Sequence, residues 1–431
     1  MTYQESIAYL EGLSRFGIRL GLERMQELVI RLGHPERKYP TIHITGTNGK
    51  GSTTACLAAI LQEAGFRTGM YTSPHLERYT ERMRIDGLEV EEAVFAHAIE
   101  QTAAAAREME RDGLEHPTQF EVLTAAAFVM FAAMKVDYAV IEVGLGGSLD
   151  STNVIESRVA VITNVTLEHE DRCGSTVRKI AEHKAGIIKK NSRVLTAAQG
   201  EALEVIRQRA ADCGAVVQVL GEEWQAQMQS VSLTGIAWML QQPNGSSWPL
   251  QARLVGEHQV YNASLAVMAA LTVRETAVNQ EAVARGLAKA CWPGRFEVLR
   301  TQPPLVIDGA HNPAGAAVLR RTLDQVFPGR EVLFLLGILK DKDIEGITGL
   351  LVREQDRVIA VRPLSERAAE AGDLASHFPP HQVEAVPDWE EGVNRLLELA
   401  EQEPRKVACV AGSLYLLGAV RPLLLQKLQN K

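Results

Sequence analysis

The 431-residue sequence lacks the features that mark secreted, membrane-spanning or zinc-binding chains. Its five cysteines are odd in number, widely spaced and never arranged as Cys-x-x-Cys, which argues against a disulfide framework or a zinc site. No stretch approaches the roughly 18 consecutive apolar residues of a membrane span. The N-terminal residues carry charge and have no long apolar core, unlike a secretory signal. We therefore expect a cytoplasmic protein without a membrane partner.

Positive charge is also in short supply. The chain has 45 Lys and Arg against 53 Asp and Glu, a net charge of −8, which argues against a nucleic-acid partner. A local basic pocket for phosphates remains compatible with this balance. Hydrophobic residues make up 46% of the chain and charged residues 23%, as in ordinary globular proteins. The length predicts two domains, with three as the alternative.

Residues 40–54, PTIHITGTNGKGSTT, combine a β-branched strand, a glycine-rich turn and the start of a helix. Glycines let backbone N–H groups approach anionic oxygens, the helix N-terminus adds partial positive charge, and Lys50 adds a full one. The general nucleotide-loop pattern is missed at two positions, because Ile44 stands where its first glycine belongs and Gly51 where its hydroxyl belongs. The alternative is a glycine-rich turn with a solvated lysine, but the flanking strand and helix favour a phosphate site.

Two further predicted strands, 138–143 and 158–163, end in polar residues. Open α/β sheets bind ligands at the carboxyl ends of their strands. Glu142 is therefore expected to have a magnesium-linked role, because a hard cation bridges nucleotide oxygens to protein oxygens. His169 follows the second strand, and this position raises it above an ordinary structural histidine. Lys184 lies near the end of a predicted amphipathic helix, where the local sequence is explained as well by an exposed lysine.

Strands alternating with helices predict an α/β fold, with a mostly parallel, P-loop-type sheet covered by helices on both faces. Residues 81–87 are expected to form a turn. Residues 224–255 change to short alternating runs that predict a small antiparallel subdomain of hairpins. Pro and Gly near residue 293 mark the boundary between a first domain, 1–293, and a smaller Rossmann-like α/β domain, 294–431.

Ten motifs of the chain resemble the folylpolyglutamate synthase/dihydrofolate synthase family, a branch of the Mur ligase superfamily. They run in family order from roughly residue 41 to 418 and read HITGTNGKGS, TSPHL, ERMRIDG, FEVLTAAAF, EVGLGGSLDSTN, EHKAGIIK, HQVYNA, WPGRFEV, DGAHNPAG and GSLYLLG. The family's own loop, GTNGK followed by two small residues, explains why the general template fails. The chain departs from the family pattern at Ser148, Glu168 and His183, where arginine, aspartate and glutamate are common.

The resemblance implies ATP-dependent amide formation. A carboxylate of folate or dihydropteroate would take the γ-phosphoryl group of ATP to become an acyl phosphate, and the amine of L-glutamate would then displace phosphate. It also implies two Mg²⁺ ions, which brace the attacking and leaving oxygens, and a monomer. One alternative is a cell-wall Mur ligase, which usually carries a further N-terminal domain that the roughly 40 residues before the loop cannot supply. The other is a nucleotide-regulated binding protein without ligase activity.

The resemblance also assigns site residues, position by position. The expected ATP contacts are Thr47, Asn48, Gly49, Lys50, Gly51, Ser52, Asn262, Arg295, Asp308 and His311. The expected metal ligands are Ser73, Glu142, His169 and, once carbamylated, Lys184; Lys50, Lys184 and His169 are the expected catalytic residues. The expected substrate contacts are Thr118, Gln119, Phe120, Leu149, Asp150, Ser151 and Ser413, the last near the incoming glutamate. Closure of the two domains would complete the site.

Overall fold

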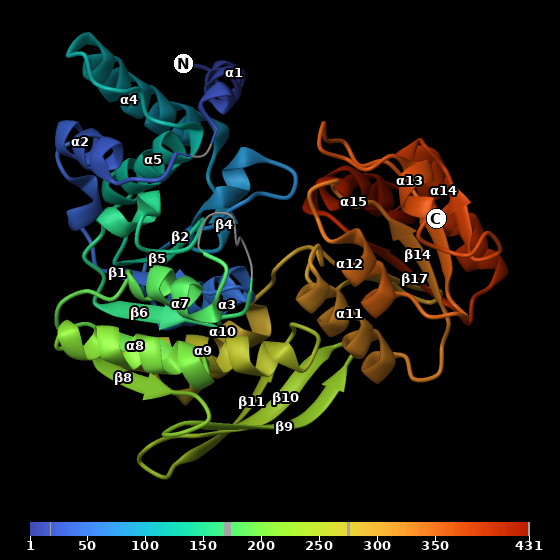
Figure 1. Ribbon diagram of the computed structural model, residues 1–431. Helices are drawn as coiled ribbons and strands as arrows, with labels where there is room; N and C mark the ends of the chain where they lie inside the picture. Colours follow the sequence, from blue (N-terminus) through green and yellow to red (C-terminus); the bar gives the residue numbers. More distant parts are fainter. Residues whose placement is uncertain (18, 168–173, 274–275, 430–431) are drawn as a thin grey trace. The chain divides into compact units, whose positions relative to one another are not determined.

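The computed structural model describes residues 1–17, 19–167, 174–273 and 276–429, which form two compact units (Figure 1). The first unit comprises Met1–Met228, Trp238–Ala252 and Gln259–Cys291, and the second comprises Gln229–Ala237, Arg253–His258 and Trp292–Lys431. Across the described ranges, no helix has both the length and the apolar character needed to cross a membrane.

The first unit is built on an eight-stranded sheet in the order β4-β3-β2-β5-β1-β6-β7-β8. The strands are β1 (Thr41–Thr45), β2 (Thr68–Tyr71), β3 (Met83–Ile85), β4 (Leu88–Glu89), β5 (Tyr138–Glu142), β6 (Val159–Ile162), β7 (Arg193–Thr196) and β8 (Val216–Val219). Neighbours from β2 to β8 pair in parallel, and β3 pairs antiparallel with both β2 and β4. The predicted mostly parallel sheet is therefore confirmed.

The turn expected over residues 81–87 is wrong in part, because Met83–Ile85 forms strand β3. The strand pairs with β2 and buries Met83 and Ile85, and the turn itself is confined to Asp86 and Gly87, both with positive φ. Three residues are too few for strand alternation to be recognised in a sequence. The partner strand, which lies in the tertiary structure, is what makes this segment extended.

Helices cover both faces of the first sheet. Ile141 of β5 packs in a cluster with α4 and α5, whereas Val140, which points to the other face, is equally buried. Helix α3 contacts β1, β2, β5 and α10. The helices of this part are α1 (Tyr3–Gly12), α2 (Glu23–Arg31), α3 (Lys50–Glu63), α4 (Glu92–Arg111), α5 (Gln119–Ala133), α7 (Val177–Ala185), α8 (Gly200–Asp212), α9 (His258–Thr272) and α10 (Gln280–Lys289), with short 3₁₀ helices η1 (Leu13–Phe16), η2 (Pro35–Arg37), η3 (Tyr79–Arg82) and η4 (Ser151–Val154).

The segment predicted as antiparallel hairpins forms a three-stranded sheet of order β11-β10-β9. Its strands are β9 (Gln225–Ser232), β10 (Gly235–Gln241) and β11 (Ser247–Ala252). Only two residues join β9 to β10, so the pair must be antiparallel. Trp238 of β10 is fully buried, which gives this small sheet an apolar anchor.

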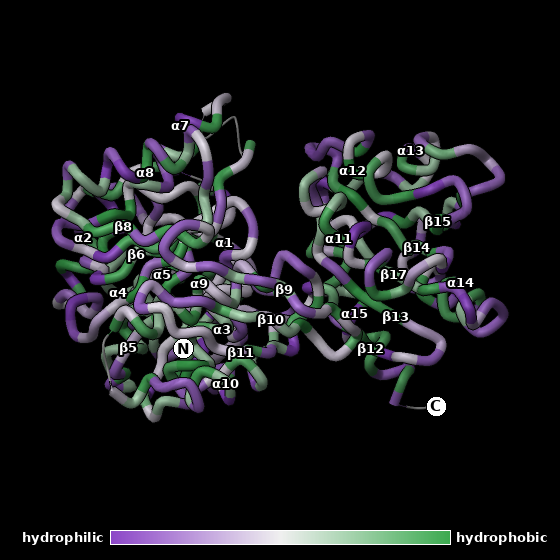
Figure 2. The backbone as a smooth tube through the Cα atoms, turned by 90° about the horizontal axis from the view of Figure 1, so that it is seen from below, coloured by the Kyte–Doolittle hydropathy of each residue, from purple (hydrophilic) through white to green (hydrophobic). Residues whose placement is uncertain are grey.

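The second unit contains a six-stranded sheet of order β12-β13-β17-β14-β15-β16. The strands are β12 (Glu297–Thr301), β13 (Pro304–Ile307), β14 (Val332–Leu336), β15 (Arg357–Ala360), β16 (Val383–Ala385) and β17 (Val407–Ala411), and the helices are α11 (Pro313–Val326), α12 (Ile344–Leu351), α13 (Ala371–Ala375), α14 (Trp389–Gln402) and α15 (Leu414–Gln429). All pairs are parallel except β12 with β13. The central strands β14 and β17 are buried throughout and hydrophobic along their length (Figure 2), as expected for a parallel sheet with both faces covered.

Candidate active site

Four neighbouring parallel strands of the first sheet, β2, β5, β1 and β6, end at one edge. Glu142 ends β5 and glycines follow it, and the segments after the other three strands carry Ser73, the Gly46–Lys50 loop and Asn164. This edge is where open α/β sheets bind ligands. The topology thus brings together the phosphate loop and the acidic strand end that the sequence analysis singled out separately.

Lys50 is the first residue of α3 and folds back over its own loop. Its Nζ donates hydrogen bonds to the carbonyl oxygens of Gly46, at 3.0 Å, and Thr47, at 3.2 Å. Gly49 has a φ of 85°, in the left-handed region, and a Cβ atom placed on it would lie 2.2 Å from Oδ1 of Asn262. The loop therefore needs glycine there, and Asn262 of α9 lies directly against it.

The loop backbone is held by residues that follow β6. Thr47 N donates to Asn164 O at 3.0 Å and Asn48 N donates to Asn164 Oδ1 at 2.9 Å. Thr163 Oγ1 donates to Asn48 O at 2.7 Å, and a Cβ on Gly46 would lie 1.8 Å from that hydroxyl oxygen. The sequence analysis missed Thr163 and Asn164, although Thr163 ends a predicted strand and Asn164 directly follows it.

These bonds decide which loop amides remain for a ligand. The N–H groups of Thr47 and Asn48 are used inside the protein. The N–H groups of Lys50, Gly51 and Ser52, in the first turn of α3, have no acceptor within the helix, because no helical carbonyl precedes them by one turn. An anion entering this loop would therefore meet the N–H groups of the helix N-terminus and the Lys50 ammonium.

Glu142 ends β5 with only 4% of its surface exposed, and its Oε2 accepts a hydrogen bond from Ser73 N at 3.3 Å. Mg²⁺ takes oxygen ligands and often binds through one or two carboxylates together with phosphates and water. A buried carboxylate next to a serine, at the edge that carries the phosphate loop, fits that donor set. Within the described residues, no group of three or more His, Cys, Asp and Glu could hold a metal by itself. Two of the residues considered in the sequence analysis, His169 and Glu168, lie outside the described residues.

Lys184 lies in the last turn of α7 and is 4% exposed. This burial excludes the ordinary exposed lysine that its local sequence allowed. A Cβ on Gly147 would lie 2.6 Å from the His183 carbonyl oxygen and 3.1 Å from Lys184 Cα, so the loop after β5 packs directly on this helix end. The structure thereby places Lys184 next to the glycine loop that follows Glu142.

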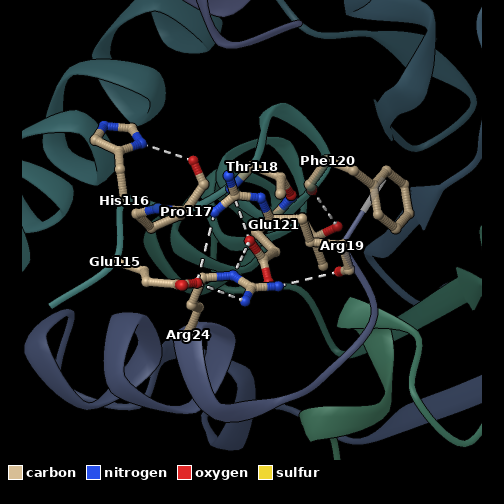
Figure 3. Close-up of polar contacts among 9 residues, drawn as sticks. Arg19, Arg24, Glu115, His116, Pro117, Thr118, Phe120 and Glu121 are labelled. Atoms are coloured by element: carbon tan, nitrogen blue, oxygen red, sulfur yellow. Dashed lines mark hydrogen bonds and ion pairs between the residues drawn. The ribbon is translucent and has the colours of Figure 1, made fainter. Parts of the chain in front are cut away.

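Thr118, Gln119 and Phe120 lie at the N-terminus of α5. Figure 3 shows Thr118 and Phe120 there. Thr118 is the N-cap, with its Oγ1 accepting from Glu121 N and its own N–H donating to Glu121 Oε2. A Cβ on Gly144 would lie 2.4 Å from Cζ of Phe120, so this ring packs on the loop after β5. One of the expected substrate positions, Phe120, is therefore held against the acidic strand end.

Arg24 of α2 is a residue of this region that the sequence analysis missed (Figure 3). Its Nε donates to Glu121 Oε2 at 3.2 Å, its Nη1 to Glu115 Oε2 at 3.1 Å and its Nη2 to Arg19 O at 3.0 Å. The Glu121 side chain is 1% exposed, and its Oε1 has no hydrogen-bond partner within the described structure. Arg24 thus provides the counter-charge for a buried carboxylate at the start of α5, across 97 positions of sequence.

Asp150 is buried, and its oxygens organise the backbone around it. Oδ1 accepts from Thr152 N at 3.0 Å and Thr152 Oγ1 at 2.5 Å, and Oδ2 accepts from Leu145 N at 2.8 Å. Burial raises the pKa of Asp150, opposed by these hydrogen bonds. Of the two neighbouring substrate positions, Leu149 is 40% exposed and Ser151 is buried. Leu149 is therefore the apolar side chain of this segment that can contact a ligand.

In the second unit, Asp308 follows β13 and holds the backbone on either side of it. Its Oδ2 accepts from Phe296 N at 2.7 Å and its Oδ1 from Ala310 N at 2.8 Å. A Cβ on Gly309 would lie 2.1 Å from Nη1 of Arg295, so this guanidinium lies against the same loop. Burial raises the pKa of Asp308, and the Arg295 charge opposes that effect.

Two further expected residues lie at strand ends of the second sheet. His311 Nδ1 is 2.7 Å from the Gly309 carbonyl oxygen. Ser413 follows β17, is buried, and accepts a hydrogen bond from Leu416 N at 3.1 Å. Since β13 and β17 are parallel neighbours, the structure brings Asp308, His311 and Ser413 to one edge of this sheet.

A sheet with a phosphate loop, followed by a second α/β unit with polar strand ends, defines the class of protein. Residues 44–270 match the Mur ligase middle domain and residues 294–414 match the Mur ligase glutamate ligase domain. The chain is also 33% identical to the dihydrofolate synthase/folylpolyglutamate synthase of Bacillus subtilis, over 97% of this chain and 98% of that protein. The chain belongs to the Mur ligases and, among them, to the folylpolyglutamate synthase/dihydrofolate synthase family, as the motifs predicted.

Solved structures agree with this assignment. The Mycobacterium tuberculosis folylpolyglutamate synthase complexed with ADP superposes with a TM-score of 0.91 at 32% identity, covering 98% of this chain and 99% of that one. The Escherichia coli FolC in complex with DHPP and ADP gives a TM-score of 0.88 at 30% identity, covering 100% and 99%. The predicted α/β fold, with a mostly parallel first sheet and a second sheet unit, is therefore that of the family.

Proposed function

We propose that this chain is an ATP-dependent ligase that adds L-glutamate to a folate, with dihydropteroate as a second candidate substrate. The observation that carries the proposal is the full-length likeness to folylpolyglutamate and dihydrofolate synthases, combined with a phosphate loop beside a buried carboxylate at one sheet edge. The likeness does not favour a cell-wall Mur ligase or a binding protein without ligase activity.

The phosphate loop supplies positive charge for ATP. Phosphate oxygens entering the loop would replace the Gly46 and Thr47 carbonyls as acceptors of the Lys50 ammonium. They would also accept hydrogen bonds from the first-turn N–H groups of α3. Asn262, which lies against Gly49, is assigned to the nucleoside part by the family pattern. The same pattern assigns Arg295, Asp308 and His311 to the phosphates and Ser413 to the incoming glutamate.

The reaction then needs positioning more than covalent help from the protein. The substrate carboxylate oxygen attacks the γ-phosphorus and ADP leaves, which gives an acyl phosphate. The glutamate amine attacks the acyl carbon, phosphate leaves, and the amine loses a proton. Holding the carboxylate in line with the phosphorus accounts for much of such a rate enhancement.

Ser73, Glu142 and His169 are the residues that would hold Mg²⁺, with Lys184 joining them if it is carbamylated. The bound ion supplies charge neutralisation at the transferring phosphoryl group, and two ions would act on both sides of it. Carbamylation would convert Lys184 from a cation into a carboxylate-like ligand, and its burial next to the Gly147 loop supports that role.

Phosphate release by the purified protein tests the proposal. With Mg²⁺ and ATP, we expect release only when L-glutamate and either a monoglutamyl folate or dihydropteroate are both present. Assaying the two pteroates side by side decides whether one or both reactions occur. Turnover of a muramyl precursor, with none on any pteroate, would overturn the folate assignment.

A further inference from the structure

A buried chain of side chains connects β1 to the segment that follows β5. His43 and Thr45 point to the same face of β1, because strand side chains alternate. Thr45 Oγ1 donates to Gly146 O at 2.7 Å. His43 Nε2 lies 2.8 Å from Thr152 Oγ1, which lies 2.5 Å from Asp150 Oδ1. His43 and Thr152 are fully buried, and Asp150 is 4% exposed.

The direction of these bonds fixes the histidine tautomer. Asp150 accepts backbone hydrogen bonds on both oxygens, from Leu145 N and Thr152 N, so it acts as the acceptor for the Thr152 hydroxyl as well. That hydroxyl has a single proton, so its oxygen must accept from His43 Nε2–H. Burial, helped by the Lys189 charge, lowers the pKa of His43 to about 3 and keeps the ring neutral. Nδ1 is then bare, in keeping with its lack of a hydrogen-bond partner in the described structure.

This series of hydrogen-bonded side chains ends at the loop that follows Glu142. Asp150 holds the backbone N–H of Leu145 at 2.8 Å and also bonds the backbone of Gly144, two residues after Glu142. We propose that His43 is a positioning residue for the folate substrate: through Thr152 it fixes Asp150 and thereby the shape of the loop at residues 144–148. The inference rests on the proposed function, since it names the ligand that this loop serves.

The competing explanation is a core histidine that only fills space. A buried imidazole carries a desolvation cost that an apolar residue of similar size would avoid. Replacing both hydrogen-bonding partners by apolar groups of matching shape can be nearly neutral for stability. A space-filling role therefore predicts effects on stability alone, whereas a positioning role predicts effects on the folate site that return when the donor is restored.

The test uses paired variants of the full-length protein. His43→Leu and Thr152→Val remove the chain, whereas His43→Gln and Thr152→Ser keep a donor and a hydroxyl. We expect the first pair to raise KM for the folate about tenfold with KM for ATP unchanged, and the second pair to stay within about threefold of the wild type. The double variant His43→Leu/Thr152→Val should have a KM for the folate no higher than either single variant, because both changes break the same series of hydrogen bonds. Thr102→Val is the matched control, since it removes a buried hydroxyl that bonds only within α4.

A measurement without substrate separates this inference from the proposed function. In ¹H–¹⁵N spectra of the imidazoles, the His43 signal, identified by its loss in His43→Gln, should show a proton on Nε2 and should shift in Thr152→Val. A proton on Nδ1, additive effects in the double variant, or equal loss of all parameters without rescue by Gln and Ser would overturn the positioning role. Absence of folate-dependent turnover in the wild type would instead overturn the proposed function and leave the ring signal to report on the chain.

Discussion

Ser148 and His183 are joined by two hydrogen bonds. Ser148 Oγ lies 3.0 Å from His183 Nδ1, and Ser148 N donates to the His183 carbonyl oxygen at 2.8 Å. The backbones are close as well, since a Cβ on Gly186 would lie 2.4 Å from Ser148 Cβ. These are two of the three positions at which the chain departs from the family pattern, so the departures form one local pair beside Lys184.

This pairing predicts that the family residues are tolerated together and not singly. Ser148→Arg alone removes the hydroxyl that bonds His183 and crowds the end of α7. We expect this to lower the free energy of unfolding by about 1–2 kcal/mol, or the Tm by a few degrees. Ser148→Arg/His183→Glu should regain most of that loss, because the arginine then has a carboxylate in reach. Thermal unfolding of the two single variants and the double variant checks this, and strictly additive losses would show that the two positions are independent.

Lys50→Ala should abolish turnover, with kcat lowered on the order of 100- to 1000-fold, because the phosphates lose the full positive charge that folds over the loop. Steady-state phosphate release measures the effect. Lys190→Ala, at an exposed position, is the charge-matched control and should leave the rate unchanged. An undiminished rate in Lys50→Ala would mean that another loop binds the phosphates.

Gly144→Ala should disturb the folate site more than the nucleotide site. The added methyl would lie 2.4 Å from Phe120 Cζ and 3.1 Å from Asp150 Oδ2, so the ring and the loop must move apart, at a cost of about 1–3 kcal/mol. We expect a raised KM for the folate and a lowered Tm, and partial recovery of the Tm in Gly144→Ala/Phe120→Leu, in which the clashing ring is removed. Nucleotide affinity measured by calorimetry serves as the control and should stay within about twofold.

Arg24→Ala should destabilise the protein by about 3 kcal/mol, because it leaves the buried Glu121 carboxylate without its counter-charge. Adding Glu121→Gln should recover a large part of this loss, since the charge itself is then removed. Urea unfolding of Arg24→Ala, Glu121→Gln and the double variant measures the coupling. Equal losses in Arg24→Ala and in the double variant would assign the cost to packing by the arginine stem.

His43 also predicts a pH dependence of stability. Its folded pKa, about 3, lies below that of the unfolded chain, about 6.5, so the unfolded state binds the proton first. The stability it contributes is present above pH 6.5 and is lost as the pH falls toward 3, by at most about 1.4 kcal/mol per pH unit. His43→Gln should therefore flatten the acid limb of urea midpoints between pH 6.5 and 4, and an unchanged slope would contradict the buried neutral ring.

The sequence alone determined the α/β layers, the phosphate loop and the family, because strand alternation, glycine turns and contiguous motifs are local properties of the chain. Glu142 was recognisable for the same reason, since it lies near the end of a predicted strand, and Ser73 was recognisable because it stands in the TSPHL motif of the family. Strand β3 was missed because three residues hold too little pattern to be read without the partner strand.

Only the tertiary structure decided which distant residues support the site. Arg24 and Glu121 are 97 positions apart, and His43 and Thr152 are 109 apart, so no spacing in the sequence relates them. Lys184 has the local sequence of an exposed helix lysine, and its burial is visible only in the tertiary structure, where Gly147 packs against the end of α7. The physical reason is common to all three: burial and hydrogen-bond geometry depend on what the fold places opposite a side chain, whereas the chain records only what lies next to it.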